Sequence, residues 1–269
     1  RIGDFAFHGC SGLTNIVIPD SVTFIDKSAF YGCNGVLRTA GNCKFVDDFA
    51  FDIVDKSIHI VSIPNGVTRI GDSAFRDCSG LTSIVIPDGV TRIGNDAFSC
   101  CSGLTGAYIT DLAKWCAIDF GNNSANPLYY AHKLYLNNEL VTNLIIPDGI
   151  TSIGNYAFCD CSGLTSITIP EGVTSIGDGA FSGCYKLVEV INKSDLNITK
   201  GSSNNGYIAY YALNVKKDGT SDIVNKDDYL FYTCDNVNYL VGYVGSNTDL
   251  TLPDDYNAQN YELNNYAFV

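Results

Sequence analysis

Cysteine is the residue type in this sequence most able to bind metals or react, and it occurs 11 times among 269 residues. Zinc and redox sites use pairs spaced as Cys-x-x-Cys, and the close pairs Cys100 with Cys101 and Cys159 with Cys161 lack that spacing. An odd number of cysteines also cannot pair completely into disulfides. Free cysteine is among the most buried residue types. Six cysteines stand three residues after a phenylalanine, and we expect them to form an inward ladder of small apolar side chains: Cys10, Cys33, Cys78, Cys101, Cys161 and Cys184.

The other residue types that catalyse reactions or bind metals are few or unsuitably spaced. The histidines His8, His59 and His132 lie in different parts of the chain, and no nucleophile motif such as Gly-x-Ser-x-Gly accompanies them. A Cys–His pair could therefore arise only through tertiary proximity. The paired aspartates at 47–48, 227–228 and 254–255 do not follow the ligand spacing of a calcium loop. We expect no catalytic residue, no cofactor and no structural metal.

A repeat of about 23 residues determines where these side chains stand. Stacked repeats of 20–29 residues bury one continuous core, because each unit cannot bury its apolar face alone. The sequence therefore predicts an elongated solenoid. The intervals between the anchor phenylalanines are 23, 21, 24, 23, 60, 23 and 87 residues, and the anchors are Phe7, Phe30, Phe51, Phe75, Phe98, Phe158, Phe181 and Phe268.

The unit from Leu81 to Phe98 shows how one coil should fold. Leu81, Ile84 and Ile86 follow the alternation of a short strand, with these side chains facing inward. Pro87 ends the strand because it has no N–H for the ladder. The segment around Phe98 predicts a helical or 3₁₀ turn, in which each phenylalanine packs on its counterpart one coil away. Because like residues superpose in successive coils, the Leu-x-x-Ile-x-Ile segments should form one parallel sheet.

Two insertions interrupt the array. The first is interpreted as a widened repeat at 105–146, with a short helix that Asp111 should cap. The second, at 188–252, is rich in tyrosine and alternates in a way that predicts strands and hairpins, so it could be a small subdomain. The repeat resumes at 251–269. We interpret 1–269 as a single solenoid segment of a longer protein, because both ends fall inside a repeat.

The repeat motif is Ile-Pro-x-x-Val-Thr-x-Ile-Gly-x-x-Ala-Phe-x-x-Cys-x-x-Leu-Thr, matched by regular units at 63–104 and 144–187 and by partial ones at 1–33 and 251–268. It resembles the BspA-like (Treponema pallidum-type) leucine-rich repeats of bacterial surface proteins. The resemblance implies a predominantly β variety of α/β fold: a right-handed solenoid with a parallel concave sheet, helical or 3₁₀ turns on the return side and two insertions. It also implies an extracellular, cell-surface location, with signal and anchor elsewhere, adhesion in some members, and no shared catalytic residue.

The net charge of the chain argues against nucleic acids and anionic membranes as binding partners. Lys and Arg number 16 against 29 Asp and Glu, which gives a net charge of −13 and repels nucleic acid and anionic membranes. No apolar run approaches the ~18 residues that a membrane span needs. We expect no nucleic-acid partner and no membrane insertion in this segment. The expected partner is a host or bacterial surface protein or glycan.

The candidate binding site is the concave side of the strands, where side chains point away from the core. The strip is either a partner-binding surface or ordinary β-propensity on a flat sheet. The leading hypothesis is a non-enzymatic recognition or adhesion scaffold. The alternatives are a structural spacer that displays another domain and, more remotely, a surface enzyme acting on glycans. The candidate residues are Val17, Ser83, Val85, Tyr108, Asn143, Ile145, Ser166, Thr168, Glu189 and Ile191.

Overall fold

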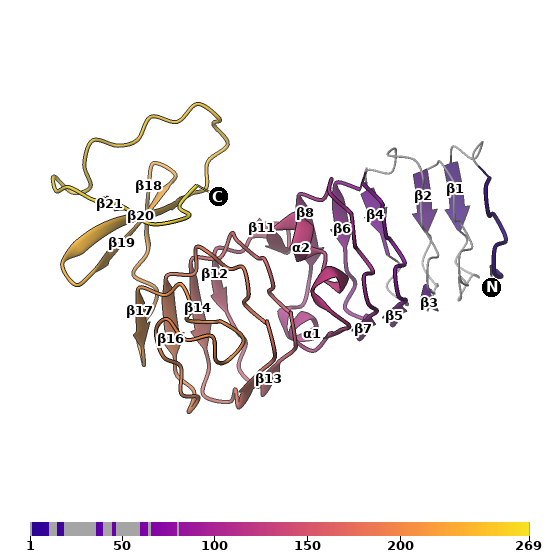
Figure 1. Cartoon of the computed structure of the whole chain (residues 1–269), viewed down its shortest axis with the longest axis horizontal. Helices are drawn as coiled ribbons and strands as arrows, with labels where there is room; N and C mark the ends of the chain where they lie inside the picture. The colour runs from indigo at the N-terminus through magenta and orange to yellow at the C-terminus, as the bar shows by residue number, and fades with distance from the viewer. Residues whose placement is uncertain are drawn as a thin grey trace.

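The protein is an elongated stack of coils that ends in a group of hairpins (Figure 1). The computed structural model describes residues 2–10, 15–18, 36–39, 45–46, 60–63, 66–79 and 81–268, with the strands before Ile63 described by their backbone alone. The anchors Phe30 and Phe51, together with Cys33 and His59, lie outside the described residues. Two rows of parallel strands run along the stack, one of longer strands and one of two-residue strands.

In the described residues the row of longer strands is divided into three sheets rather than forming one. Strand β1 (Asn15–Ile18) pairs with β2 (Val36–Thr39). A five-stranded sheet contains β4 (Ile60–Ser62), β6 (Ser83–Val85), β8 (Gly106–Ile109), β10 (Leu134–Leu136) and β11 (Glu139–Leu140). A four-stranded sheet contains β12 (Asn143–Ile145), β14 (Ser166–Ile169), β16 (Glu189–Asn192) and β17 (Asn214–Lys216).

The break between β11 and β12 corrects the expectation of one continuous parallel sheet. All pairs between the Leu-x-x-Ile-x-Ile segments are parallel, but β11 pairs antiparallel with β10. Asn137 and Asn138 both have positive φ angles, 52° and 70°, the conformation of a tight two-residue hairpin. This hairpin returns the chain along β10, so the parallel ladder does not pass directly from β10 to β12.

The second row lines the opposite side of the coils with strands of two residues. One sheet contains β3 (Phe45–Val46), β5 (Arg69–Ile70), β7 (Arg92–Ile93) and β9 (Asp119–Phe120), and another contains β13 (Ser152–Ile153) and β15 (Ser175–Ile176). Threonine hydroxyls add a ladder between successive coils, each donating to a carbonyl oxygen 23 residues earlier. Within the described part of the chain, such bonds run from Thr91 to Thr68 at 3.1 Å, from Thr105 to Thr82 at 3.0 Å, from Thr165 to Thr142 at 3.0 Å and from Thr174 to Thr151 at 3.1 Å.

The core of the stack is filled by the inward positions of the regular repeats, whereas the predicted anchor Phe268 is 47% exposed and does not pack in the core. Leu81, Ile84 and Phe98 have no exposed surface, which confirms their predicted orientation. The anchor rings stack between neighbouring coils, with centroids 5.2 Å apart for Phe75 and Phe98. The same contact joins Phe158 to Phe181 at 5.3 Å.

The return turns around these phenylalanines differ from the expected helical or 3₁₀ turns. In each regular coil the residues two before and two after the phenylalanine have positive φ, whereas both helix types need consecutive negative values. The chain therefore closes as successive tight turns, such as the bond from the Cys78 N–H to the Phe75 carbonyl at 3.2 Å. The residues with positive φ in four coils are Ser73 and Asp77, Asp96 and Cys100, Tyr156 and Asp160, and Gly179 and Gly183.

The first insertion keeps the stack continuous. It contains α1 (Leu112–Cys116), β9, the 3₁₀ helix η1 (Asn123–Ala125) and α2 (Leu128–Ala131). The Asp111 side chain accepts from the N–H groups of Ala113 and Lys114 at 2.8 and 3.1 Å, so the predicted cap is confirmed. Trp115 donates from Nε1 to the Ala157 carbonyl at 2.8 Å, which joins the insertion to the next regular coil.

The second insertion forms the predicted strands and hairpins, but β16 and β17 within 188–252 continue the sheet of the solenoid, so only the part after Lys216 folds away from the stack. Strands β18 (Val224–Lys226), β19 (Tyr229–Cys234), β20 (Val237–Tyr243) and β21 (Glu262–Leu263) make a four-stranded sheet. One side of the β19–β20 hairpin packs on Val188 of the solenoid through Leu230 and Val241, and the other packs Phe231 against Tyr256. The segment expected to resume the repeat at 251–269 places β21 beside β20, because β20 offers the free edge there.

Candidate binding surface on the strand face

The strand face comprises the outward-pointing side chains of β6, β8, β10, β11, β12, β14 and β16, and it is open for part of its length. Val85 is 37% exposed and Ile145 60% exposed. Asn143 is exposed, while Ser83, Tyr108 and Thr168 are half-buried. Val17 belongs to β1, whose side chains lie outside the described part of the structure. Three of the ten predicted residues are instead buried: Ser166, Glu189 and Ile191.

A stacked pair of tyrosines lies at the centre of the open part. Tyr108 on β8 stands beside Tyr135 on β10, with ring centroids 4.5 Å apart and planes 9° apart. Both rings lie over Gly106, where an added Cβ would come within 2.9 Å of Tyr135 and 3.0 Å of Tyr108. The missing side chain thus allows the rings to lie along the sheet. The repeat did not predict Tyr135 because it stands in the widened unit, although its alternation with Leu134 and Leu136 was a readable signal.

Apolar side chains flank the tyrosine pair on both sides. Val85 is the neighbour of Tyr108 in the parallel register, and Leu140 is the neighbour of Tyr135 across the β10–β11 hairpin. Ile145 then projects from β12 beyond the break in the sheet. Exposed apolar patches of this kind often mark interaction sites.

The far end of the strand face is closed, which corrects the expectation that Ser166, Glu189 and Ile191 are outward and free. The Glu189 carboxylate is fully buried and lies 2.8 Å from the Lys216 ammonium. It also accepts from the Asp222 N–H at 3.1 Å. Lys216 in turn contacts the Asp222 carboxylate at 2.5 Å. The second insertion folds over these residues, and the buried carboxylate is stable there because it is paired and hydrogen-bonded.

A groove of about 470 Å³ runs between the strand face and the second insertion. Asn143 and Ser166 line it on the sheet side, where the Ser166 hydroxyl donates to the Asn143 side-chain oxygen at 2.8 Å. Thr220, Ser221 and Asn225 line it on the insertion side. The groove also has apolar lining residues, namely Leu140, Ile223, Leu230 and Val244, so the open strip with the tyrosine pair ends at a mixed polar and apolar surface.

A second aromatic surface lies outside the predicted site. Tyr207, Tyr210 and Tyr266 are 40%, 46% and 45% exposed. With Tyr185 and Tyr211 they form the tyrosine cluster, whose ring centroids lie 4.9 to 5.8 Å apart. Tyr229 and Tyr232 of the same insertion are buried in its core instead.

Six of the nine described cysteines are buried core residues, whereas Cys10 of the predicted ladder and Cys234 are half-buried and Cys100 is exposed. Cys101 and Cys184 are buried, and their Sγ atoms donate to carbonyl oxygens of the preceding coil at 3.0 and 3.1 Å. Burial raises the pKa of the Cys116 and Cys161 thiols to about 12, with smaller increases from Asp111 and Asp160. These thiols are therefore protonated at neutral pH, whereas a nucleophilic cysteine is held as the thiolate.

Disulfides, metal clusters and membrane helices are absent from the described residues. The nine cysteines that the structure covers are all free. Within the same ranges no three His, Cys, Asp or Glu side chains gather where they could hold a metal ion. None of the helices described there is long and apolar enough to cross a bilayer.

Comparison with known proteins places these features in a family. No curated protein matches the chain. Three similar solved structures are bacterial leucine-rich repeat proteins. For the one from Eubacterium ventriosum the identity is 21% and the TM-score 0.40, with 72% of this chain and 57% of that one covered. The protein from Bacteroides ovatus has 25% identity and a TM-score of 0.43, with 80% of this chain and 64% of that one covered. The protein from T. pallidum has 25% identity and a TM-score of 0.39, with 72% of this chain and 73% of that one covered. The chain thus spans about three fifths of the first two.

The sequence profile of the BspA-type leucine-rich repeat region matches six copies, over residues 1–123 and 131–243. This match covers most of the chain and includes both insertions in part. The stacked coils, the phenylalanine ladder and the buried cysteines are the structural counterparts of the repeated positions. The chain belongs to the BspA-type leucine-rich repeat family.

Proposed function

We propose that this chain is a non-enzymatic recognition or adhesion scaffold that binds a surface protein or glycan of a host or another bacterium. The observation that supports this best is the Tyr108–Tyr135 pair on the open strand face. Aromatic residues are enriched at the cores of interfaces, where they bury a large area and keep a polar tip for hydrogen bonding. Exposed Val85 and Ile145 extend the contact on either side.

The non-enzymatic part of the proposal is supported by the state of the candidate catalytic groups. The Cys161 and Cys184 thiols are buried with raised pKa values. The Nδ1 atom of His132 lies 3.1 Å from the Asp160 carbonyl oxygen, so this histidine contacts backbone. We also propose an extracellular, cell-surface location, which the resemblance to bacterial surface proteins supports.

The experiment is a binding screen of the chain against immobilised matrix proteins and glycans, followed by variants of the strand face. Replacing Tyr108 and Tyr135 by Ser together with Ile145→Asp should lower binding to any positive probe at least tenfold. Leu263→Asp is the matched control, because Leu263 is a strand residue that is 55% exposed but lies away from this face. Exposed substitutions such as those at Ile145 and Leu263 usually change stability within about 0.5 kcal/mol, and circular dichroism would verify that the variant with both half-buried tyrosines replaced is folded.

Two results would argue against the strand face as the site. If the folded triple variant binds as well as the wild type, the contact lies elsewhere, for example on the tyrosine cluster. If no probe in the screen binds the wild-type chain, the spacer hypothesis becomes the better account, because a spacer needs no particular outward residue.

A further inference from the structure

Two coils carry a lysine at the position directly before the first leucine of the strand segment. Regular units carry Ser-Gly-Leu there, as at 162–164, whereas these two coils read His-Lys-Leu at 132–134 and Tyr-Lys-Leu at 185–187. The Gly163 N–H donates to the His132 carbonyl at 3.3 Å, so the coil of Gly163 stacks directly on that of Lys133. The next coil carries Lys186, because β14 pairs with β16.

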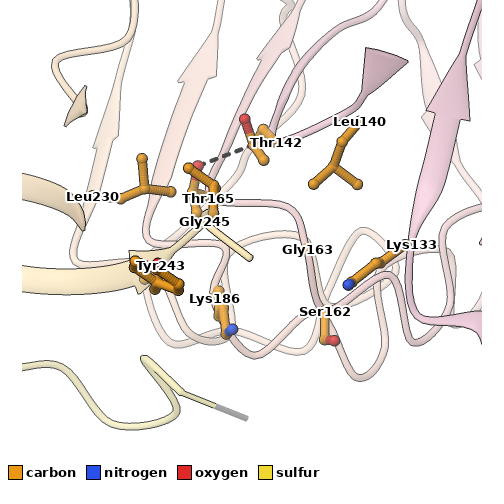
Figure 2. Close-up of a pocket in the computed structure, with 12 residues that line it drawn as sticks. Lys133, Leu140, Thr142, Ser162, Gly163, Thr165, Lys186, Leu230, Tyr243 and Gly245 are labelled. Carbon is orange, nitrogen blue, oxygen red and sulfur yellow. Dashed lines mark hydrogen bonds between the residues drawn. The ribbon is translucent and has the colours of Figure 1, made fainter. Parts of the chain in front are cut away.

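The absent side chain of Gly163 leaves a cavity between the two lysines. The cavity has a volume of about 110 Å³, and Lys133, Lys186, Ser162 and Thr165 line it together with apolar side chains such as Leu140 and Leu230. Lys133 is an exposed residue, so the cavity is open to solvent on its side. Figure 2 shows the two lysines on the solenoid coils below Thr165, while Tyr243 approaches from the hairpin of the second insertion. Cationic and hydroxyl groups from two parts of the fold thus converge on one small space.

The lysines have no acidic partner in the described part of the chain, although the protein carries a net charge of −13. No ion pair there includes either lysine. Burial lowers the pKa of Lys186, and the neighbouring charge of Lys133 lowers it further. Placing two like charges near each other is unfavourable without a counter-charge. A bound anion would remove that repulsion and supply the missing partner.

We propose that the cavity between Lys133 and Lys186 binds an oxyanion carried by a ligand, namely a carboxylate, sulfate or phosphate group. Pockets that enclose a whole drug-sized ligand measure about 300–1,000 Å³, so this cavity has room for the anionic group alone. Ammonium and hydroxyl donors suit such a group, because charge-assisted hydrogen bonds are the strong ones. The site lies off the strand face and is a second function beyond the one proposed above.

The tyrosine cluster offers a surface for the rest of the ligand. Tyr185 directly precedes the cavity residue Lys186 in the chain. Tyr266 directly precedes Ala267, and the Ala267 carbonyl oxygen would lie 3.9 Å from a Cβ added to the cavity residue Gly242. The cluster is therefore adjacent to the cavity. Tyrosine rings provide large, rigid contact area, so a flat ring attached to the anion could pack there.

The test is calorimetric titration of the full chain with sulfate, glucuronate and glucose at constant ionic strength. Glucuronate and glucose differ in the carboxylate, so the proposal predicts saturable binding of sulfate or glucuronate and none of glucose. Lys133→Gln and Lys186→Gln should each weaken anion binding about tenfold, while Lys186→Arg retains it. Lys193→Gln is the control, since Lys193 is exposed and does not line the cavity.

A variant that keeps both charges provides a second test. In Gly163→Ala the added Cβ would meet only the His132 carbonyl oxygen, at 3.7 Å, so the fold tolerates it while the cavity shrinks. Anion affinity should fall in this variant too. Tighter binding of glucuronate than of sulfate would place the sugar ring on the tyrosine cluster, and the reverse would assign the cavity to tetrahedral anions. Unchanged binding in the folded double lysine variant, or no anion binding by the wild type, would overturn the proposal.

Discussion

The pKa values of two partly buried lysines are shifted in opposite directions: that of Lys216 is raised and that of Lys186 is lowered. Partial burial acts to lower the pKa of Lys216, but hydrogen bonds to Asp222 and Glu189 outweigh it and raise the pKa. Burial is the main cause of the lowered pKa of Lys186, and the positive charge of Lys133 lowers that pKa further. Burial thus lowers the pKa of both lysines, and only at Lys216 do acidic partners reverse the direction.

The lowered pKa of Lys186 predicts a stability difference that depends on pH. Between its folded pKa and the ordinary value of 10.5, the unfolded chain binds more protons at this residue, so its contribution to stability rises with pH. Below that window the charged amine destabilises the fold. Lys186→Gln, in a cavity that also holds Lys133 and Tyr243, should therefore melt no lower than the wild type at pH 7. Any increase in the melting temperature of Lys186→Gln over that of the wild type should disappear above about pH 10.5, as thermal melts across this pH range would show.

At the scale of elements, the Glu189–Lys216 pair holds the second insertion over the strand face. Lys216→Met would leave the fully buried Glu189 carboxylate without its cation, with only the Asp222 N–H to bind it. Breaking a buried pair in this way costs about 3 kcal/mol. Denaturant unfolding would measure the loss, with Lys193→Met as the control.

The cost should depend on pH because the folded pKa of Lys216 is raised. Its contribution to stability is fully present below 10.5 and is lost as pH rises through the folded value. Adding Glu189→Gln to Lys216→Met should recover part of the loss, since no charge is then left buried. A double variant no more stable than Lys216→Met would show that the Glu189–Lys216 pair does not hold the second insertion over the strand face.

Much of the solenoid could be predicted from the sequence because its contacts repeat at one spacing. Leu81, Ile84 and Phe98 are buried as their period requires, and Asp111 caps α1 as its position before the helix indicates. The positive φ angles of the return turns could not be inferred, because Ser, Asp, Cys and Tyr occupy those positions as well as Gly.

The candidate site was only partly predictable for a different reason. Glu189 and Ser166 occupy outward positions in the repeat, and nothing within the repeat indicates that residues 217–228 fold over them. That contact joins segments far apart in the chain. The Lys133–Lys186 pair, by contrast, was visible as two departures from Ser-Gly-Leu, although only the stacking order shows that Gly163 lies between them.

At the scale of the whole molecule, a few side chains carry the stack past the break between β11 and β12. Asn126 is fully buried and donates from Nδ2 to the carbonyls of Tyr156 and Ala157 at 2.7 and 3.0 Å, while it accepts from the Leu128 N–H at 2.9 Å. Trp115 adds the bond to Ala157. In a solenoid each coil is stabilised only by its neighbours, so these bonds, together with the apolar core that continues across the break, couple the unfolding of the two halves.

Asn126→Ala should therefore weaken the joint more than it weakens either half. Leaving buried carbonyl and N–H groups without partners costs about 1–3 kcal/mol each. We expect a broader thermal transition, or two transitions, with hydrogen exchange rising first near Tyr156 and Ala157. Asn204→Ala, at an exposed asparagine, should change neither. A single transition of wild-type sharpness in Asn126→Ala would show that the joint is held by other contacts.

The threonine ladder has a consequence for how such a gene can change in length. Each hydroxyl bonds to a carbonyl 23 residues earlier, and the strand pairs keep the same offset between regular coils. Duplicating or deleting 23 codons within a regular stretch would therefore give every coil a neighbour with the same donors and acceptors. Any other length change would shift threonine away from its acceptor. Recombination between repeats in this gene should accordingly leave functional alleles whose lengths differ in whole coils.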